Sequence, residues 1–129
     1  MTRKTSNEPE TKFFSIDEAT KTLPLVKAIV ADIVTNYKSI RDSMEVREEK
    51  PGDRDLGDRI EAMKDELMSN VDELRHLGIE LKSFEIGLVD FPHMKDGKEI
   101  CLCWKLGEDK IAWWHDKESG LSGRQPLTL

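Results

Sequence analysis

Residues 15–44 read SIDEATKTLPLVKAIVADIVTNYKSIRDSM, and their apolar side chains recur at alternating steps of three and four residues. This is the heptad spacing of helices that pack side by side along one apolar seam. It predicts a long amphipathic helix that packs against a second helix. The seam consists of Ile16, Ala19, Leu23, Val26, Val30, Ile33, Tyr37, Ile40 and Met44.

The start of this helix carries a capping signal. Ser15 stands three residues before Glu18, so each side chain can bond the backbone N–H of the other residue in a capping box. Pro24 lies within the pattern and has no N–H to donate to the preceding turn. We therefore expect a kink or a restart there, with Thr22 available as a new cap.

A second heptad pattern begins at Leu56 and ends before Gly78, which is typical of a helix C-cap. Between the two patterns, residues 48–53 contain Pro-Gly-Asp and predict a turn. The chain is thus expected to form an antiparallel helical hairpin over residues 13–78.

One position of the second seam has two interpretations: either Asn70 lies on it, or Val71 faces inward and Asn70 points to water. The length of the hairpin suggests a partner. A helix over residues 24–47 is about 36 Å long, and a small sheet alone cannot cover both seams of such a pair. We expect coiled-coil packing against a second copy, which gives a four-helix homodimer.

The pattern changes to strands after the hairpin. Lys95-Asp96-Gly97-Lys98 is typical of a two-residue β-hairpin turn, and residues 106–109 predict a second such turn. The expected class is α+β, in which a single domain over residues 13–129 joins the helical hairpin to a three-stranded antiparallel meander and an irregular tail. The expected strands are residues 88–94, 99–105 and 110–115, with 79–86 as a weaker edge strand.

Two-residue turns would fix which side chains share a face of the sheet. The face expected to pack on the helices contains Val89, Phe91, His93, Ile100, Leu102, Trp104, Ile111, Trp113 and His115. The opposite face mixes polar and apolar side chains, most of them small. It contains Asp90, Met94, Cys101, Cys103, Ala112 and Trp114. Such a face is usually half covered by a tail or by another subunit.

Charge argues against one class of partner. The chain has 129 residues, of which 36% are charged, and a net charge of −6. Residues 41–66 carry 6 basic and 10 acidic groups, so most of the excess lies at the end of the hairpin. We expect no general nucleic-acid binding, which needs positive charge toward phosphates. The acidic end is either a solvated surface or a partner-binding tip.

Short segments of the sequence and the number of cysteines indicate where the protein is located. Residues 1–12 are polar without periodicity, so we expect disorder there and no signal peptide. No apolar run approaches the length of a membrane span, and two cysteines cannot form a disulfide framework. We expect a cytoplasmic protein that does not enter a membrane.

Several stretches resemble a known family. They are GLVDFP at 87–92, LCWKLGED at 102–109, Trp114-His115 and GLSGRQPL at 120–127. Together they look like the bacterial domain-of-unknown-function family numbered 2203, and FSIDEA at 14–19 is similar to that family's opening. The resemblance covers nearly the whole chain from Phe13. It implies a cytoplasmic bacterial protein and supplies no activity.

Arg124 is the strongest candidate for a specific role. Its guanidinium can pair bidentately with Asp90, Glu108 or Asp116, or with a ligand anion. We favour the first kind of contact, in which the tail is clasped onto the sheet. The candidate ligand-binding residues are Asp90, Trp104, Glu108, Asp109, Trp114, His115 and Arg124.

Other polar groups have a structural and a functional interpretation. Glu108 and Asp109 are suited to a turn, although paired carboxylates can also provide acid–base catalysis. His93 and His115 would share a face at a distance too large for joint metal ligation, so hydrogen-bonded histidines are favoured. Cys101 and Cys103 give a weak zinc signal and are expected to be small, partly buried thiols. We expect neither a metal nor another cofactor.

Two functions from different classes remain. The first is a homodimeric interaction or assembly module built on the hairpin. The alternative is a head, formed by the meander and the tail, that binds a small anionic ligand or catalyses a reaction. The first is favoured because the sequence contains no nucleophile–base signature and no phosphate-binding loop.

Overall fold

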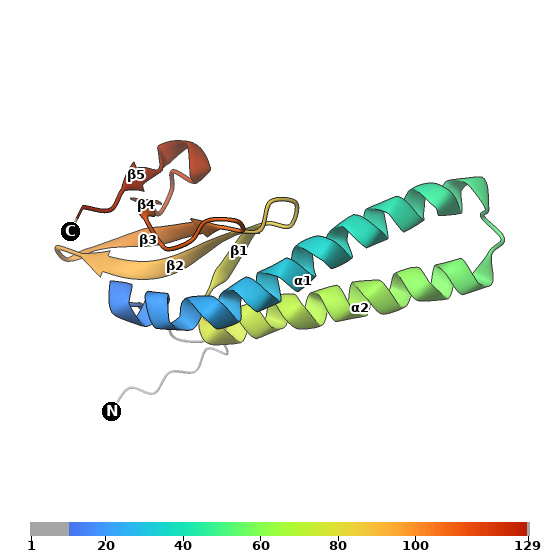
Figure 1. Ribbon diagram of the computed structural model, residues 1–129, viewed down its shortest axis with the longest axis horizontal. Coiled ribbons are helices and arrows are strands. Elements are labelled where there is room, and N and C mark those ends of the chain that lie inside the picture. The colour runs from blue at the N-terminus through green and yellow to red at the C-terminus, as the bar shows by residue number, and fades with distance from the viewer. Residues whose placement is uncertain (1–10, 129) are drawn as a thin grey trace, which may run out of the picture.

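The computed structural model describes residues 11–128, so the expected disorder over residues 1–12 lies almost wholly outside the described residues. Two long helices form an antiparallel hairpin, and a five-stranded antiparallel sheet packs on one end of it (Figure 1). The expected α+β class, with a hairpin followed by an antiparallel sheet, is confirmed.

Helix α1 (Ile16–Glu49) begins at the expected capping box. The N–H of Ser15 donates to the Glu18 carboxylate at 2.9 Å, and the N–H of Glu18 donates to the Ser15 hydroxyl at 3.0 Å. The helix continues past Pro24, so the expected restart is wrong. Thr22 is not a new cap, because its hydroxyl donates to the Glu18 carbonyl within the same helix. A kink at Pro24 stays a prediction.

Helix α2 (Arg54–Leu77) has a cap at each end. The Asp53 carboxylate accepts the N–H of Leu56 at 3.0 Å, and Gly78 closes the helix in the left-handed region at φ 87°. Val71 is buried on the seam, whereas Asn70 lies half-buried beside it. The structure thus favours Val71 as the inward residue.

Five strands replace the expected three. They follow the chain order across the sheet, and every neighbouring pair is antiparallel. The first lies within the weaker edge strand of the sequence analysis, and the last arises in the tail that was expected to be irregular. The strands are β1 (Glu80–Ser83), β2 (Leu88–Lys95), β3 (Lys98–Lys105), β4 (Trp113–Asp116) and β5 (Gln125–Pro126).

The turn between β2 and β3 is confirmed. Lys95 pairs with Lys98, and the two residues between them have positive φ, 51° at Asp96 and 80° at Gly97. These are the angles of a type I′ turn, whose twist matches that of the strands it joins.

The hydrophobic core lies between the hairpin and one face of the sheet. Seam residues such as Val26 and Val30 are fully buried there, together with the side chains that alternate along β2 and β3. The sheet contributes Val89, Phe91, Leu102 and Trp104, all at 0% exposure. This is the face that the sequence analysis assigned to the helices for these two strands.

The outer part of the hairpin extends well beyond the sheet (Figure 1), and we call residues 40–63 the arm. One apolar seam holds its two helices together, with Ile40, Leu56 and Ile60 buried. Met44 is the next residue of that seam, yet 44% of its surface is exposed. Near the tip, the two helices of the hairpin therefore leave part of this apolar seam exposed to solvent.

Gly87→Ala is expected to lower the free energy of unfolding by about 2 kcal/mol. A Cβ at this residue would lie 2.7 Å from the Val30 side chain and 2.9 Å from that of Leu106, and the backbone φ is 67°. Urea denaturation checks the value. Gly57→Ala is the control, because Gly57 lies within α2 and has nothing within 4 Å of a new Cβ. It should gain up to about 1 kcal/mol from helix propensity, and an equal loss in both variants would contradict the packing argument.

Candidate functional site

The pairing of β4 determines which polar side chains meet. Cys101 pairs with His115, and Cys103 pairs with Trp113, so these four residues share one face of the sheet. Trp114 therefore faces the core. The expected register, with Trp113 and His115 on the core face and Trp114 opposite, is wrong by one residue.

The shift arises because the second turn is not a two-residue hairpin. The Glu108 carboxylate accepts the N–H of Lys105 at 2.8 Å, so a side chain takes a donor that the next strand would otherwise use. The indole N–H of Trp104 also donates to the Glu108 carbonyl, at 3.0 Å. A loop over residues 106–112 then leads to β4, which begins at Trp113 and not at residue 110.

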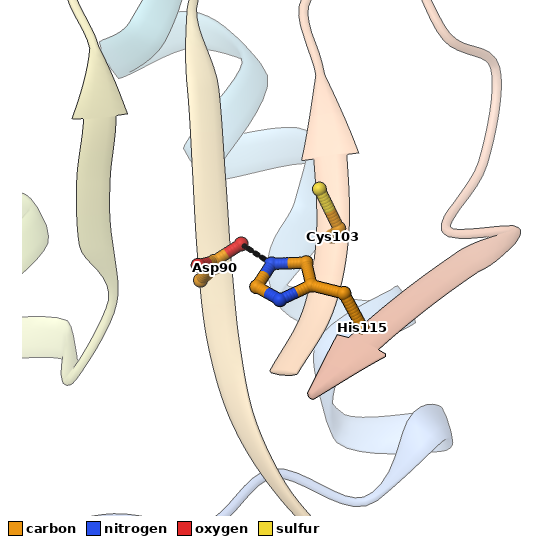
Figure 2. A group of neighbouring side chains, drawn as sticks. All are labelled: Asp90, Cys103 and His115. Atoms are coloured by element: carbon orange, nitrogen blue, oxygen red, sulfur yellow. Dashed lines mark hydrogen bonds and ion pairs between the residues drawn. The ribbon is translucent and has the colours of Figure 1, made fainter. Parts of the chain in front are cut away.

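As a result, His115 reaches across β3 to Asp90 on β2 (Figure 2). Its Nε2 atom lies 2.9 Å from Oδ1 of Asp90, and its Nδ1 atom lies 2.6 Å from the carbonyl oxygen of Asp116. Both His115 and Asp90 are about 1% exposed. The imidazole can cross β3 because the side chains of β3 next to it, those of Cys101 and Cys103, are small.

The hydrogen positions of the pair follow from its neighbours. A carbonyl oxygen only accepts, so Nδ1 of His115 carries a hydrogen. One further proton lies between Nε2 and Oδ1 of Asp90. On whichever atom it rests, the pair as a whole is neutral, which lowers the cost of burying it.

Cys103 completes a cluster of three buried side chains from three adjacent strands. One ligand atom each from Asp90, Cys103 and His115 lies within 4.8 Å of the others. Cys101 and Cys103 are buried and form no disulfide with each other. Burial raises the pKa of Cys103 to about 11 and that of Cys101 to about 12, so neither is a ready nucleophile.

Arg124 forms the clasp that the sequence analysis favoured. Its Nη1 and Nη2 atoms donate to the two oxygens of Glu108, each at 2.7 Å, and Nη2 also lies 3.3 Å from the Cys103 carbonyl oxygen. The guanidinium stacks 5.1 Å from the Trp113 ring centroid. The tail that carries Arg124 lies on the side of the sheet away from the helices (Figure 1). Of the three carboxylates considered, Glu108 is the partner.

The clasp has an electrostatic signature. Burial alone would raise the pKa of Glu108, but the hydrogen bonds from Arg124 and from the N–H of Lys105 outweigh burial and lower it. Conversely, the bonds to Glu108 raise the pKa of Arg124. The arginine charge is therefore matched by a carboxylate within the protein.

We expect this pair to make stability depend on acid pH. A carboxyl group whose pKa is lower in the folded state contributes stability above its unfolded pKa and loses it as the pH falls through the folded pKa. The free energy of unfolding of the wild type should therefore fall more steeply between about pH 5 and about pH 3 than that of Glu108→Gln. Urea denaturation at each pH measures both. Parallel curves for the two proteins would contradict the clasp's electrostatic role.

The seven candidate ligand-binding residues do not line one pocket. Trp104 and Trp114 belong to the core side of the sheet, where Trp104 is fully buried. Asp109 is exposed, and its carbonyl oxygen accepts a hydrogen bond from Lys27 at 3.0 Å. The remaining residues form the Asp90–His115 pair and the Arg124–Glu108 clasp on the opposite face.

Two further residues differ from expectation. His93 does not share a face with His115, and its Nδ1 atom lies 2.7 Å from the Phe14 carbonyl oxygen. Cys103 was missed as a neighbour of Asp90 and His115. The sequence did indicate part of this cluster, because Asp90 and Cys103 were expected on the same face of the sheet.

These features define a class of protein, an α+β domain in which a projecting helical hairpin supports a five-stranded sheet with a buried Asp–His–Cys cluster. Within residues 11–128, neither helix has the length and apolar character needed to cross a membrane. Residues 12–127 match the family described as uncharacterized conserved protein (DUF2203), and the chain belongs to this family. No curated protein and no solved structure matches the chain.

Proposed function

We propose that this protein is an assembly module that forms a homodimer through the arm. The observation that carries the proposal is Met44, which continues the buried seam of α1 but keeps 44% of its surface exposed. Val46 is exposed to the same extent but points to a different side of α1, so the proposal depends on Met44. A second copy packed on the arm would remove this apolar surface from water and complete a four-helix bundle.

The charge of the tip favours one arrangement of the two arms. Residues 41–66 carry an excess of four acidic groups, so two tips placed side by side would repel each other. A twofold axis perpendicular to the arms makes them antiparallel and places each tip away from the other. We therefore propose an antiparallel pair of arms.

Met44→Glu is expected to shift the protein to the monomer, because it places a charge in the apolar contact. Leu25→Glu is the matched control, since Leu25 lies on the same helix with 48% exposure but outside the arm. Light scattering coupled to size exclusion measures the mass of each variant. Dimerisation that survives Met44→Glu, or that is lost equally in Leu25→Glu, would contradict the proposal. Val30 and Ile33 are unsuitable positions, because both are fully buried within one chain.

We also propose a cytoplasmic location. Two free, buried cysteines are typical of a protein in a reducing compartment, and they support this location.

A small-molecule-binding head is the second candidate, and the buried Asp90–Cys103–His115 cluster favours it. Arg124 is a weak anion receptor, because Glu108 already occupies its guanidinium. If the head binds an anion, Arg124→Ala should abolish the ligand's effect on the melting temperature and leave the fold intact. If this variant only unfolds more readily, Arg124 is a clasp and the anion hypothesis fails.

A further inference from the structure

We propose that Asp90, Cys103 and His115 bind a zinc ion in the sheet of this protein. The three side chains offer a carboxylate oxygen, a sulfur and an imidazole nitrogen, all within 4.8 Å of one another. Thiolate and imidazole together select zinc and related transition metals and disfavour magnesium and calcium.

The separations, from 2.9 Å to at most 4.8 Å, span those of a tetrahedral site. Ligand atoms at ordinary zinc distances lie roughly 3.3–3.6 Å from one another. Oδ1 of Asp90 and Nε2 of His115 are 2.9 Å apart, so a metal would part them slightly and draw the Cys103 sulfur inward. The proposal therefore requires rotations of these three side chains, which lie on adjacent strands.

His115 is already held as a metal-binding histidine is held. Its Nδ1–H donates to the carbonyl oxygen of Asp116, which fixes the ring and directs Nε2 toward the cluster. Ligating histidines characteristically use their second ring nitrogen in this way.

A second observation points to an absent ligand. Oδ2 of Asp90 is buried and has no hydrogen-bond partner among the described residues. An unpaired buried carboxylate oxygen is costly, and coordination to a cation would satisfy it.

Charge balance is compatible with burial. Zn²⁺ would replace the thiol proton of Cys103 and the proton shared by Asp90 and His115, so two positive charges enter and two protons leave. The net charge of the site stays at zero. The positive charge of Arg124 does not oppose the ion, because Glu108 neutralises it.

This proposal departs from the sequence expectation of no metal. The three residues converge only because β4 is shifted by one residue from its expected register. Their spacing along the chain is unlike that of a common zinc motif.

Cobalt provides the direct test, because thiolate ligation of Co²⁺ gives a charge-transfer band in the near ultraviolet. Full-length protein is treated with a chelator, and CoCl₂ or ZnCl₂ is added both to the folded protein and during refolding from urea, since the ligands are buried. The wild type should show the thiolate band, displaced by zinc at one ion per chain. Cys103→Ser should lose the band, and Cys101→Ser should keep it.

Asp90→Asn provides a second measurement that keeps the side-chain volume. It should weaken zinc binding by about 10- to 100-fold, measured by competition with a chromogenic chelator. Circular dichroism establishes that each variant is folded. A wild type without the thiolate band under either condition would overturn the proposal. A band that survives in Cys103→Ser or disappears in Cys101→Ser would overturn it equally.

Discussion

Arg124→Ala is expected to lower the free energy of unfolding by about 3 kcal/mol. The guanidinium makes two hydrogen bonds of 2.7 Å to Glu108, and the two side chains are only 13% and 20% exposed. Removal of Arg124 leaves the Glu108 charge partly buried, and among the described residues only the N–H of Lys105 still donates to it. It also frees the tail from the outer face of the sheet.

Arg75→Ala is the matched control for this effect. Arg75 also pairs with a carboxylate, that of Asp72, at 2.9 Å, but the two side chains are 67% and 52% exposed. Exposed pairs contribute about 0–1 kcal/mol, so this variant should unfold almost as the wild type does. Urea denaturation of both variants compares them. If Arg124→Ala costs no more than Arg75→Ala, the clasp does not hold the tail.

Asp90→Ala is expected to have the largest effect, a loss of about 3–5 kcal/mol. The change leaves Nε2 of His115 in a buried site without an acceptor and opens a cavity beside it. Asp72→Ala is the control, because its carboxylate lies on the surface of α2. Thermal or urea denaturation measures both. A loss below about 1 kcal/mol for Asp90→Ala would show that the pair is not buried as described.

The helices were predictable from sequence because their signals are local. Ser15 and Glu18 are three residues apart and specify the start of α1 by themselves. Gly78 and the Asp96-Gly97 turn likewise depend on backbone angles that few residues adopt. The seam was predictable because its period alone identifies the buried face.

The site was only half predictable because it depends on contacts between distant segments. The bond from Arg124 to Glu108 spans 16 residues, and the bond from His115 to Asp90 spans 25. Glu108 ends the pairing of β3 with a side chain instead of a backbone group, and no turn rule describes that contact. One misplaced turn then moved every β4 side chain to the wrong face.

Two helices of the same pattern can pair within one chain or between chains, so the heptad spacing does not by itself specify assembly. In this structure most of the seam is buried within the chain, whereas Met44 in the arm is not. The case for a dimer therefore depends on the arm and not on the whole seam.

Sedimentation equilibrium of the wild-type protein tests the proposed assembly most directly. We expect a mass of twice 14.8 kDa at high micromolar concentration, with dissociation toward 14.8 kDa on dilution. A mass of 14.8 kDa throughout that range would contradict the proposed homodimer, because the exposed apolar part of the arm would then have no second copy to cover it.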